Sequence, residues 1–159
     1  MYGSRRGVIA CTLSHWALAN ALLQDDAYEA YIVLEDDVEL HPLWHESIDQ
    51  VYHESRHFDV CFLGYHIQRH LKSSLSSFML NVNDVPRVNR LDTSLFMGGS
   101  FAYILGKKGA RQIVNNLNHY GMQKPIDVLN PYFLHCSLGQ CIPFAASSEW
   151  SFDRGAKRP

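Results

Sequence analysis

Residues 31–40 read Tyr-Ile-Val-Leu-Glu-Asp-Asp-Val-Glu-Leu, so a short apolar run rich in β-branched side chains leads directly into a cluster of acids. An unbroken apolar run of this length is typical of a central strand that is covered on both faces. The sequence therefore predicts a buried strand over residues 31–34, with Glu35, Asp36 and Asp37 at its carboxyl end.

Three consecutive carboxylates repel one another, and a divalent cation with oxygen ligands removes that cost. Ligands of open α/β sheets bind beyond the carboxyl ends of the strands, where this cluster falls. In an extended segment Glu35 and Asp37 point to one side and Asp36 to the other. We therefore predict that Glu35 and Asp37 bind one metal ion and that Asp36 faces a different partner. A solvated acidic turn is the alternative that the sequence leaves open.

Apolar periodicity and turn residues divide the rest of the chain into alternating helices and strands. This alternation predicts an α/β fold with a mixed, mostly parallel sheet flanked by helices, in a single domain over residues 1–159 with a flexible tail at 147–159. The predicted helices cover residues 7–24, 41–55 and 107–120, with a helical turn at 125–134. The predicted strands cover 58–63, 78–82, 86–90, 100–105 and 141–145, and a mobile loop is expected at 72–77.

Composition narrows the classes of function. The 159 residues are 47% hydrophobic and 19% charged, with a net charge of −2, which suits one compact domain and gives no basic surplus for nucleic acid. The sequence shows no signal peptide and no apolar run long enough to span a bilayer, so we expect at most peripheral contact with a membrane. The four cysteines form no C-x-x-C pair. We read them as reduced, which favours a cytoplasmic location.

Four segments, taken in order, carry a resemblance to a known family. Together they resemble glycosyltransferase family 25, which includes bacterial lipooligosaccharide galactosyltransferases and procollagen galactosyltransferases. The resemblance covers roughly residues 7–130. The segments are Gly7-Val-Ile-Ala-Cys-Thr-Leu-Ser-His15, Ile32-Val-Leu-Glu-Asp-Asp-Val-Glu-Leu40, Gly98-Gly-Ser-Phe-Ala-Tyr-Ile-Leu-Gly-Lys-Lys-Gly-Ala110 and Pro125-Ile-Asp127.

The resemblance implies a GT-A-like fold, a UDP-sugar donor, Mn²⁺ or Mg²⁺, and inverting transfer of a hexose to a glycan or a protein-linked hydroxyl. It places the family's D-x-D-like element on Glu35, Asp36 and Asp37. Members of the family carry a further stretch before the segment that begins here at Gly7, and only six residues precede Gly7 in this sequence. The alternative function is therefore a truncated, catalytically inactive member that binds a glycan or a partner protein.

An inverting displacement needs a base for the acceptor hydroxyl, and a carboxylate is the usual choice. Asp127 is the candidate, because Pro125 marks a predicted helix start with fixed backbone geometry. Asp is also a favoured N-cap residue, so a purely structural role is an equal alternative.

The remaining candidates bind the donor in the predicted site. The resemblance suggests that the helix bearing Ser14 and His15 borders the donor pocket, where His15 contacts a phosphate; a hydrogen-bonded histidine beside the core is the alternative. Gly98 and Gly99 allow backbone to approach a sugar closely, or they form a plain turn. Cys11, in an apolar run, is expected to be a buried small hydrophobic residue.

Overall fold

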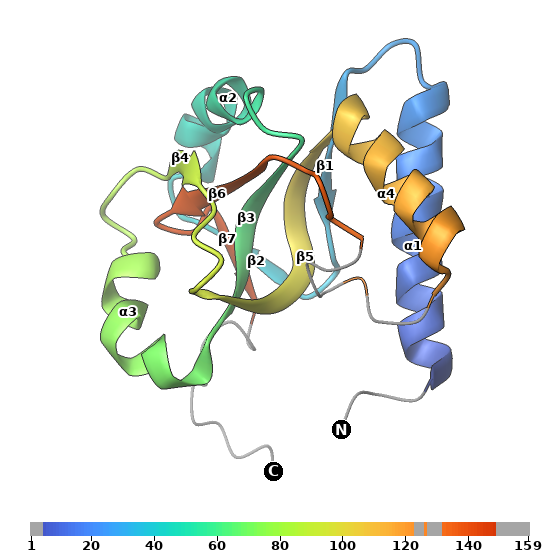
Figure 1. Cartoon of the computed structure of the whole chain (residues 1–159). Coiled ribbons are helices and arrows are strands. Elements are labelled where there is room, and N and C mark those ends of the chain that lie inside the picture. The colour runs from blue at the N-terminus through green and yellow to red at the C-terminus, as the bar shows by residue number, and fades with distance from the viewer. Residues whose placement is uncertain (1–4, 123–125, 127–131, 149–159) are drawn as a thin grey trace.

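The structure, a computed structural model, describes residues 5–122, 126 and 132–148, and it has the α/β architecture that the sequence predicts (Figure 1). The helices are α1 (Arg5–Gln24), α2 (Trp44–Ser55), the 3₁₀ turn η1 (Arg69–Leu71), α3 (Lys72–Met79) and α4 (Lys107–Tyr120). The strands are β1 (Ala30–Leu34), β2 (Val38–Leu40), β3 (Val60–Ile67), β4 (Arg87–Arg90), β5 (Phe96–Gly106), β6 (Leu138–Ile142) and β7 (Ala146–Ser148).

The main sheet has the strand order β1-β5-β3-β6-β4. Only β3 and β6 pair in parallel, whereas β1–β5, β3–β5 and β4–β6 are antiparallel. The sheet is mixed, but the prediction of a mostly parallel sheet is wrong. The helix α2 does join two strands of the same direction, β1 and β3, yet β5 inserts between them in the opposite direction. Alternating helices and strands indicate strand direction along the chain, but they do not indicate which strands become neighbours.

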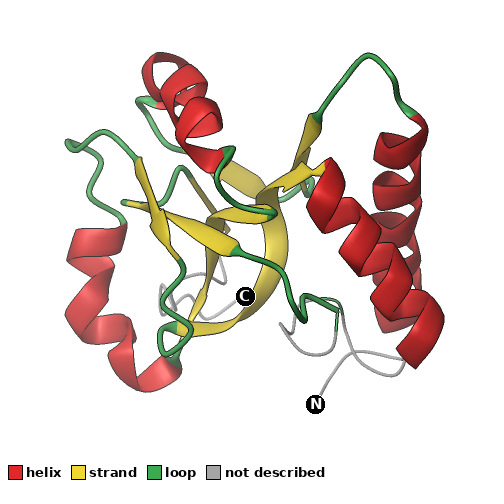
Figure 2. Ribbon diagram, turned by 45° about the horizontal axis from the view of Figure 1, so that its top comes forward, coloured by secondary structure: helices red, strands yellow, loops and turns green. Residues whose placement is uncertain are grey.

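Each face of the sheet has its own hydrophobic core, and this follows from the alternation of side chains along β5. Tyr103 and Leu105 lie in the core that also receives side chains of α1 and α4. Ala102 and Ile104 lie in the other core, which contains Val51 of α2. The helices α1 and α4 lie side by side on one side of the sheet in both views (Figures 1 and 2). These helices fix the face of β5 on which the candidate site forms.

The strand β1 lies at the edge of the sheet, which corrects the prediction of a central strand. It pairs with β5 on one side, and its outward-facing Ile32 and Leu34 are each 41% exposed. Only Val33 of this strand is buried. A run of four apolar residues shows that a strand is favourable, but it does not show how many neighbours that strand has.

Several local predictions also change. The Ser-rich segment at 72–77 is the helix α3 rather than a loop, because Leu71, Leu75 and Met79 recur at helical spacing and pack against the first core. The strand predicted at 78–82 is therefore absent from the described residues. Two short strands, β2 and β7, form a second sheet that the sequence did not indicate, and they bring part of the predicted tail, residues 147 and 148, into a strand. None of the described helices combines the length and apolarity needed to cross a bilayer.

Candidate functional site

Glu35 directly follows β1, at the carboxyl end of that strand. Its backbone N–H donates to the carbonyl of Phe101 on β5 at 2.8 Å, which continues the strand pairing by one residue. The next two acids, Asp36 and Asp37, form a turn into β2, whose residue Val38 pairs with Ser148. The extended alternation assumed for the three acids therefore does not occur. The turn changes the direction of the chain directly after Glu35, and all three acids are exposed.

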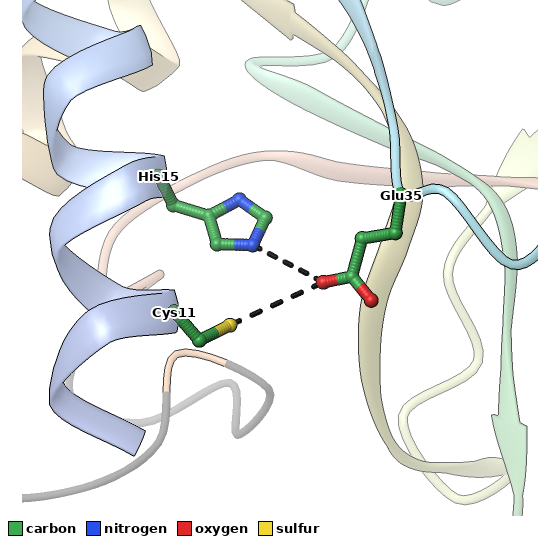
Figure 3. Close-up of side chains that lie close together, drawn as sticks. All are labelled: Cys11, His15 and Glu35. Atoms are coloured by element: carbon green, nitrogen blue, oxygen red, sulfur yellow. Dashed lines mark hydrogen bonds and ion pairs between the residues drawn. The ribbon is translucent and has the colours of Figure 1, made fainter. Parts of the chain in front are cut away.

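The side chain of Glu35 faces helix α1, where it meets Cys11 and His15 (Figure 3). Nε2 of His15 lies 3.5 Å from Oε1 of Glu35, and the thiol of Cys11 donates to the same oxygen at 4.0 Å. One ligand atom from each of the three residues lies within 4.8 Å of the other two. A nitrogen, a sulfur and an oxygen thus converge on one small volume beside the end of β1.

Helix geometry explains why the two residues of α1 act together. Cys11 and His15 are four residues apart, so they lie one above the other on one face of the helix. His15 is 5% exposed, whereas Glu35 is 39% exposed and Cys11 is half-buried. The group is therefore anchored in the protein on the histidine side and open to solvent on the carboxylate side.

Tyr103 on β5 fixes the orientation of the His15 ring. Its hydroxyl lies 2.6 Å from Nδ1 of His15, and both side chains are buried. Burial raises the pKa of the Tyr103 phenol well above its ordinary value, so the hydroxyl keeps its proton. A neutral hydroxyl can donate to Nδ1 or accept from it. Either tautomer of His15 is thus satisfied, and Nε2 always points toward Glu35.

Gly98 and Gly99 lie on β5 at the same end of the sheet as Glu35. Gly98 pairs with His66 of β3, and Gly99 has a φ of 99°, in the region that favours glycine. A Cβ on Gly99 would lie 2.7 Å from Cδ2 of His66. The two glycines belong to the strand β5, so the prediction of a plain turn is wrong, while a role in ligand approach stays a prediction.

Among the described residues, no contact joins the other predicted site residues to Cys11, His15 or Glu35. Ser14 is exposed, and its hydroxyl donates to the carbonyl of Ala10 within α1 at 3.1 Å. Asp127 lies outside the described residues. Its neighbour Ile126 is described, and the Ile126 carbonyl accepts from the Ser100 hydroxyl on β5 at 3.2 Å. The metal and catalytic assignments of Asp37 and Asp127 stay predictions.

A cavity of about 620 Å³ lies at the opposite end of the sheet, where β1 and β3 begin and β5 ends. Its lining includes four basic residues, Arg56, Lys107, Lys108 and Arg111. Two acids of the lining pair with the two lysines: Glu29 lies 3.4 Å from Lys107, and Asp59 lies 3.2 Å from Lys108. This cavity lies at the other end of the sheet from Glu35, Asp36 and Asp37, and its lining contains no run of consecutive acids.

Sequence reasoning missed Cys11 as a member of the group and Tyr103 as the partner of His15. Cys11 was expected to be buried, but it is half-buried with its sulfur toward Glu35. A signal was present, because Cys and His at a spacing of four on a helix share one face and are both metal ligands. Tyr103 lies 88 residues from His15 along the chain, and the two meet only because α1 packs on the face of the sheet that carries Tyr103.

Comparison with known proteins gives two matches. The sequence model of one protein family, described as "Glycosyltransferase family 25 (LPS biosynthesis protein)", matches residues 5–129. The chain is also 28% identical over 124 residues to a protein of Acanthamoeba polyphaga mimivirus named "Putative glycosyltransferase R655". That match covers 70% of this chain and 35% of the viral protein, so it spans about a third of the length of that relative. No solved structure matches the chain.

Proposed function

Because the chain belongs to glycosyltransferase family 25, we propose that it transfers a hexose from a UDP-sugar to a hydroxyl of a glycan or a protein-linked acceptor. Galactose is the sugar to test first, since the galactosyltransferases of this family are the proteins that the sequence resembles. The observation that carries the proposal is the position of Glu35, which is held at the carboxyl end of β1 by its bond to Phe101, with its carboxylate open to solvent. Ligands of α/β sheets bind at such a position.

Glu35 and Asp37 would hold Mn²⁺ or Mg²⁺ in this site, because both offer the hard carboxylate oxygens that these ions prefer and both are exposed. Bound there, the ion would supply Lewis-acid stabilisation of the departing UDP. Asp36 follows Glu35 in the same exposed turn and would contact the donor. The turn is fixed on both flanks, by β5 before it and by β7 after it, so these acids start from a defined backbone position.

Asp127 is the proposed base that accepts the proton of the acceptor hydroxyl. Two features support it. The family match extends to residue 129, and the preceding Ile126 accepts a hydrogen bond from Ser100 on β5, next to Phe101, whose carbonyl accepts from the Glu35 N–H. Inversion follows if the hydroxyl attacks from the face opposite the leaving UDP, with the proton passing to the Asp127 carboxylate as the new glycosidic bond forms.

Release of UDP from a panel of UDP-hexoses, with and without an acceptor hydroxyl, tests the proposal. We expect release that requires Mn²⁺ or Mg²⁺, and its loss in Asp37→Asn. Asp49→Asn is the matched control, because Asp49 is an exposed acid on α2 and lies outside the predicted site. A folded chain that binds a glycan yet releases no UDP above background would favour the alternative, a binding protein without catalytic activity.

A further inference from the structure

We propose that Cys11, His15 and Glu35 form a binding site for a thiophilic divalent cation of the Zn²⁺ class, with three protein ligands and one open position. This site differs from the proposed site for Mn²⁺ or Mg²⁺, because it uses a sulfur and a nitrogen from α1 and shares only Glu35 with it. Its existence does not depend on the proposed glycosyltransferase function.

The distances fit tetrahedral zinc. Bonds of about 2.0–2.3 Å at tetrahedral angles put nitrogen and oxygen ligands about 3.4 Å apart and sulfur and oxygen ligands about 3.6 Å apart. In the structure, Nε2 of His15 and Sγ of Cys11 lie 3.5 Å and 4.0 Å from Oε1 of Glu35. The third pair, Nε2 and Sγ, lies within 4.8 Å, and rotation of the Glu35 and Cys11 side chains would bring the three atoms toward tetrahedral spacing.

The chemistry of the ligand set selects the metal. A thiolate and an imidazole favour zinc and similar ions over Mg²⁺ and Mn²⁺, which prefer oxygen ligands. A Cys11 thiolate, a Glu35 carboxylate and a neutral His15 together balance the charge of one Zn²⁺. Binding would release the Cys11 thiol proton to solvent, as the sulfur exchanges its S–H bond for the bond to zinc.

Tyr103 completes the argument as a positioning residue. A metal on Nε2 requires the proton of His15 on Nδ1, and the Tyr103 oxygen, 2.6 Å away, can accept that proton's hydrogen bond. Second partners of this kind hold metal-binding histidines in the correct tautomer. The fourth position faces solvent beside Glu35, so it is open to water or to an anionic oxygen.

Sharing of Glu35 has a consequence that does rest on the proposed function. A zinc ion bound between α1 and Glu35 removes that carboxylate from the site for Mn²⁺ or Mg²⁺. We therefore expect Zn²⁺ to inhibit the transferase at concentrations that fill the site, and Cys11→Ser to relieve this inhibition while it keeps the activity supported by Mn²⁺.

Titration of the metal-free chain with Zn²⁺ against a chromogenic chelator tests the site without any activity assay. We expect one tight equivalent, weakened more than about a hundredfold in Cys11→Ser and weakened in His15→Gln. Three variants should keep the tight site: Cys136→Ser, a half-buried cysteine outside the group; His57→Ala, an exposed histidine outside the group; and Asp37→Asn. With Co²⁺, the thiolate-to-metal charge-transfer band should appear in the wild type and be missing in Cys11→Ser.

Equal zinc affinity in the wild type and Cys11→Ser, or no tight equivalent in the wild type, would overturn the proposal. Thermal unfolding of each metal-free variant shows whether it is folded. If His15→Gln is unfolded, Cys11→Ser alone decides the test. The two proposals fail separately. Loss of the zinc site leaves UDP release untouched, and an inactive chain still reports zinc binding.

Discussion

The hydroxyl of Tyr103 on β5 lies 2.6 Å from Nδ1 of His15 on α1. This buried contact connects the helix to the longest described strand of the sheet. Replacing Tyr103 by Phe keeps the ring in the core and removes only the oxygen. The buried nitrogen of His15 then loses its partner, which costs about 1–3 kcal/mol.

We therefore expect Tyr103→Phe to lower the free energy of unfolding by that amount, measured by urea denaturation. It should also weaken zinc binding by about 10- to 100-fold, the usual effect of losing the second partner of a metal-binding histidine. Tyr132→Phe removes another buried hydroxyl, which donates to the carbonyl of Gly121 outside the group. That control should leave zinc affinity unchanged, and equal losses of affinity in both variants would contradict the positioning role of Tyr103.

Gly99 is expected to tolerate a side chain less well than Gly121, although both have positive φ values, of 99° and 67°. A Cβ on Gly121 meets nothing within 4 Å, so Gly121→Ala carries only the conformational cost of about 1–3 kcal/mol. A Cβ on Gly99 would lie 2.7 Å from Cδ2 of His66, and overpacking of this kind adds about 1–3 kcal/mol. Chemical denaturation of the two variants measures the difference, and an equal loss of stability would show that the strand relaxes around the new methyl group.

Helix and strand positions were largely accessible to sequence reasoning, because they depend on local periodicity. The helix α4, predicted at 107–120, occupies those residues, since its apolar side chains repeat at helical spacing between Gly106 and Gly121. Strand β3 was predicted to end at residue 63 but continues to Ile67, because Tyr65 and Ile67 remain buried in the sheet. The order of strands depends on contacts between distant segments, and no local pattern carries that information.

The candidate site divides in the same way. Glu35 was predicted correctly as the first residue beyond the strand, because a short apolar run followed by acids is a local signal. Its surroundings were missed, because Cys11 lies 24 residues from Glu35 and Tyr103 lies 88 residues from His15. Both contacts form only through the packing of α1 on the sheet. The short strands β2 and β7, each of three residues, are too short to show an alternating pattern.

Asp25 and Tyr31 should make stability depend on pH at both extremes. The Tyr31 hydroxyl donates to Oδ2 of Asp25 at 2.6 Å, and the N–H of Ala27 donates to Oδ1 at 2.8 Å. The Tyr31 bond, followed by the Ala27 bond, lowers the pKa of Asp25 below its ordinary value of 3.8. The same bond to Asp25 raises the pKa of Tyr31 above its ordinary value of 10.0.

The two shifts have opposite consequences. The stabilisation of the fold by Asp25 is present above pH 3.8 and is lost as the pH falls through its lowered pKa. The stabilisation by Tyr31 is present below pH 10.0 and is lost as the pH rises through its raised pKa. The melting temperature of the wild type minus that of Tyr31→Phe should therefore be constant across neutral pH and shrink in acid and in alkali. A difference that grows below pH 3.8 would contradict this assignment.

Cysteine reactivity should separate Cys11 from Cys136, although both are half-buried. Burial, more than the nearby Asp59 carboxylate, raises the pKa of the Cys136 thiol to about 12, so near neutral pH almost none of it is the reactive thiolate. Iodoacetamide labelling followed by peptide mass spectrometry should therefore modify Cys136 only slowly at neutral pH. Zinc should slow the labelling of Cys11 alone, because a metal-bound sulfur is a poor nucleophile toward the reagent. Protection of Cys11 by Mg²⁺ to the same degree would show that the metal acts through Glu35 and the fold rather than through the sulfur.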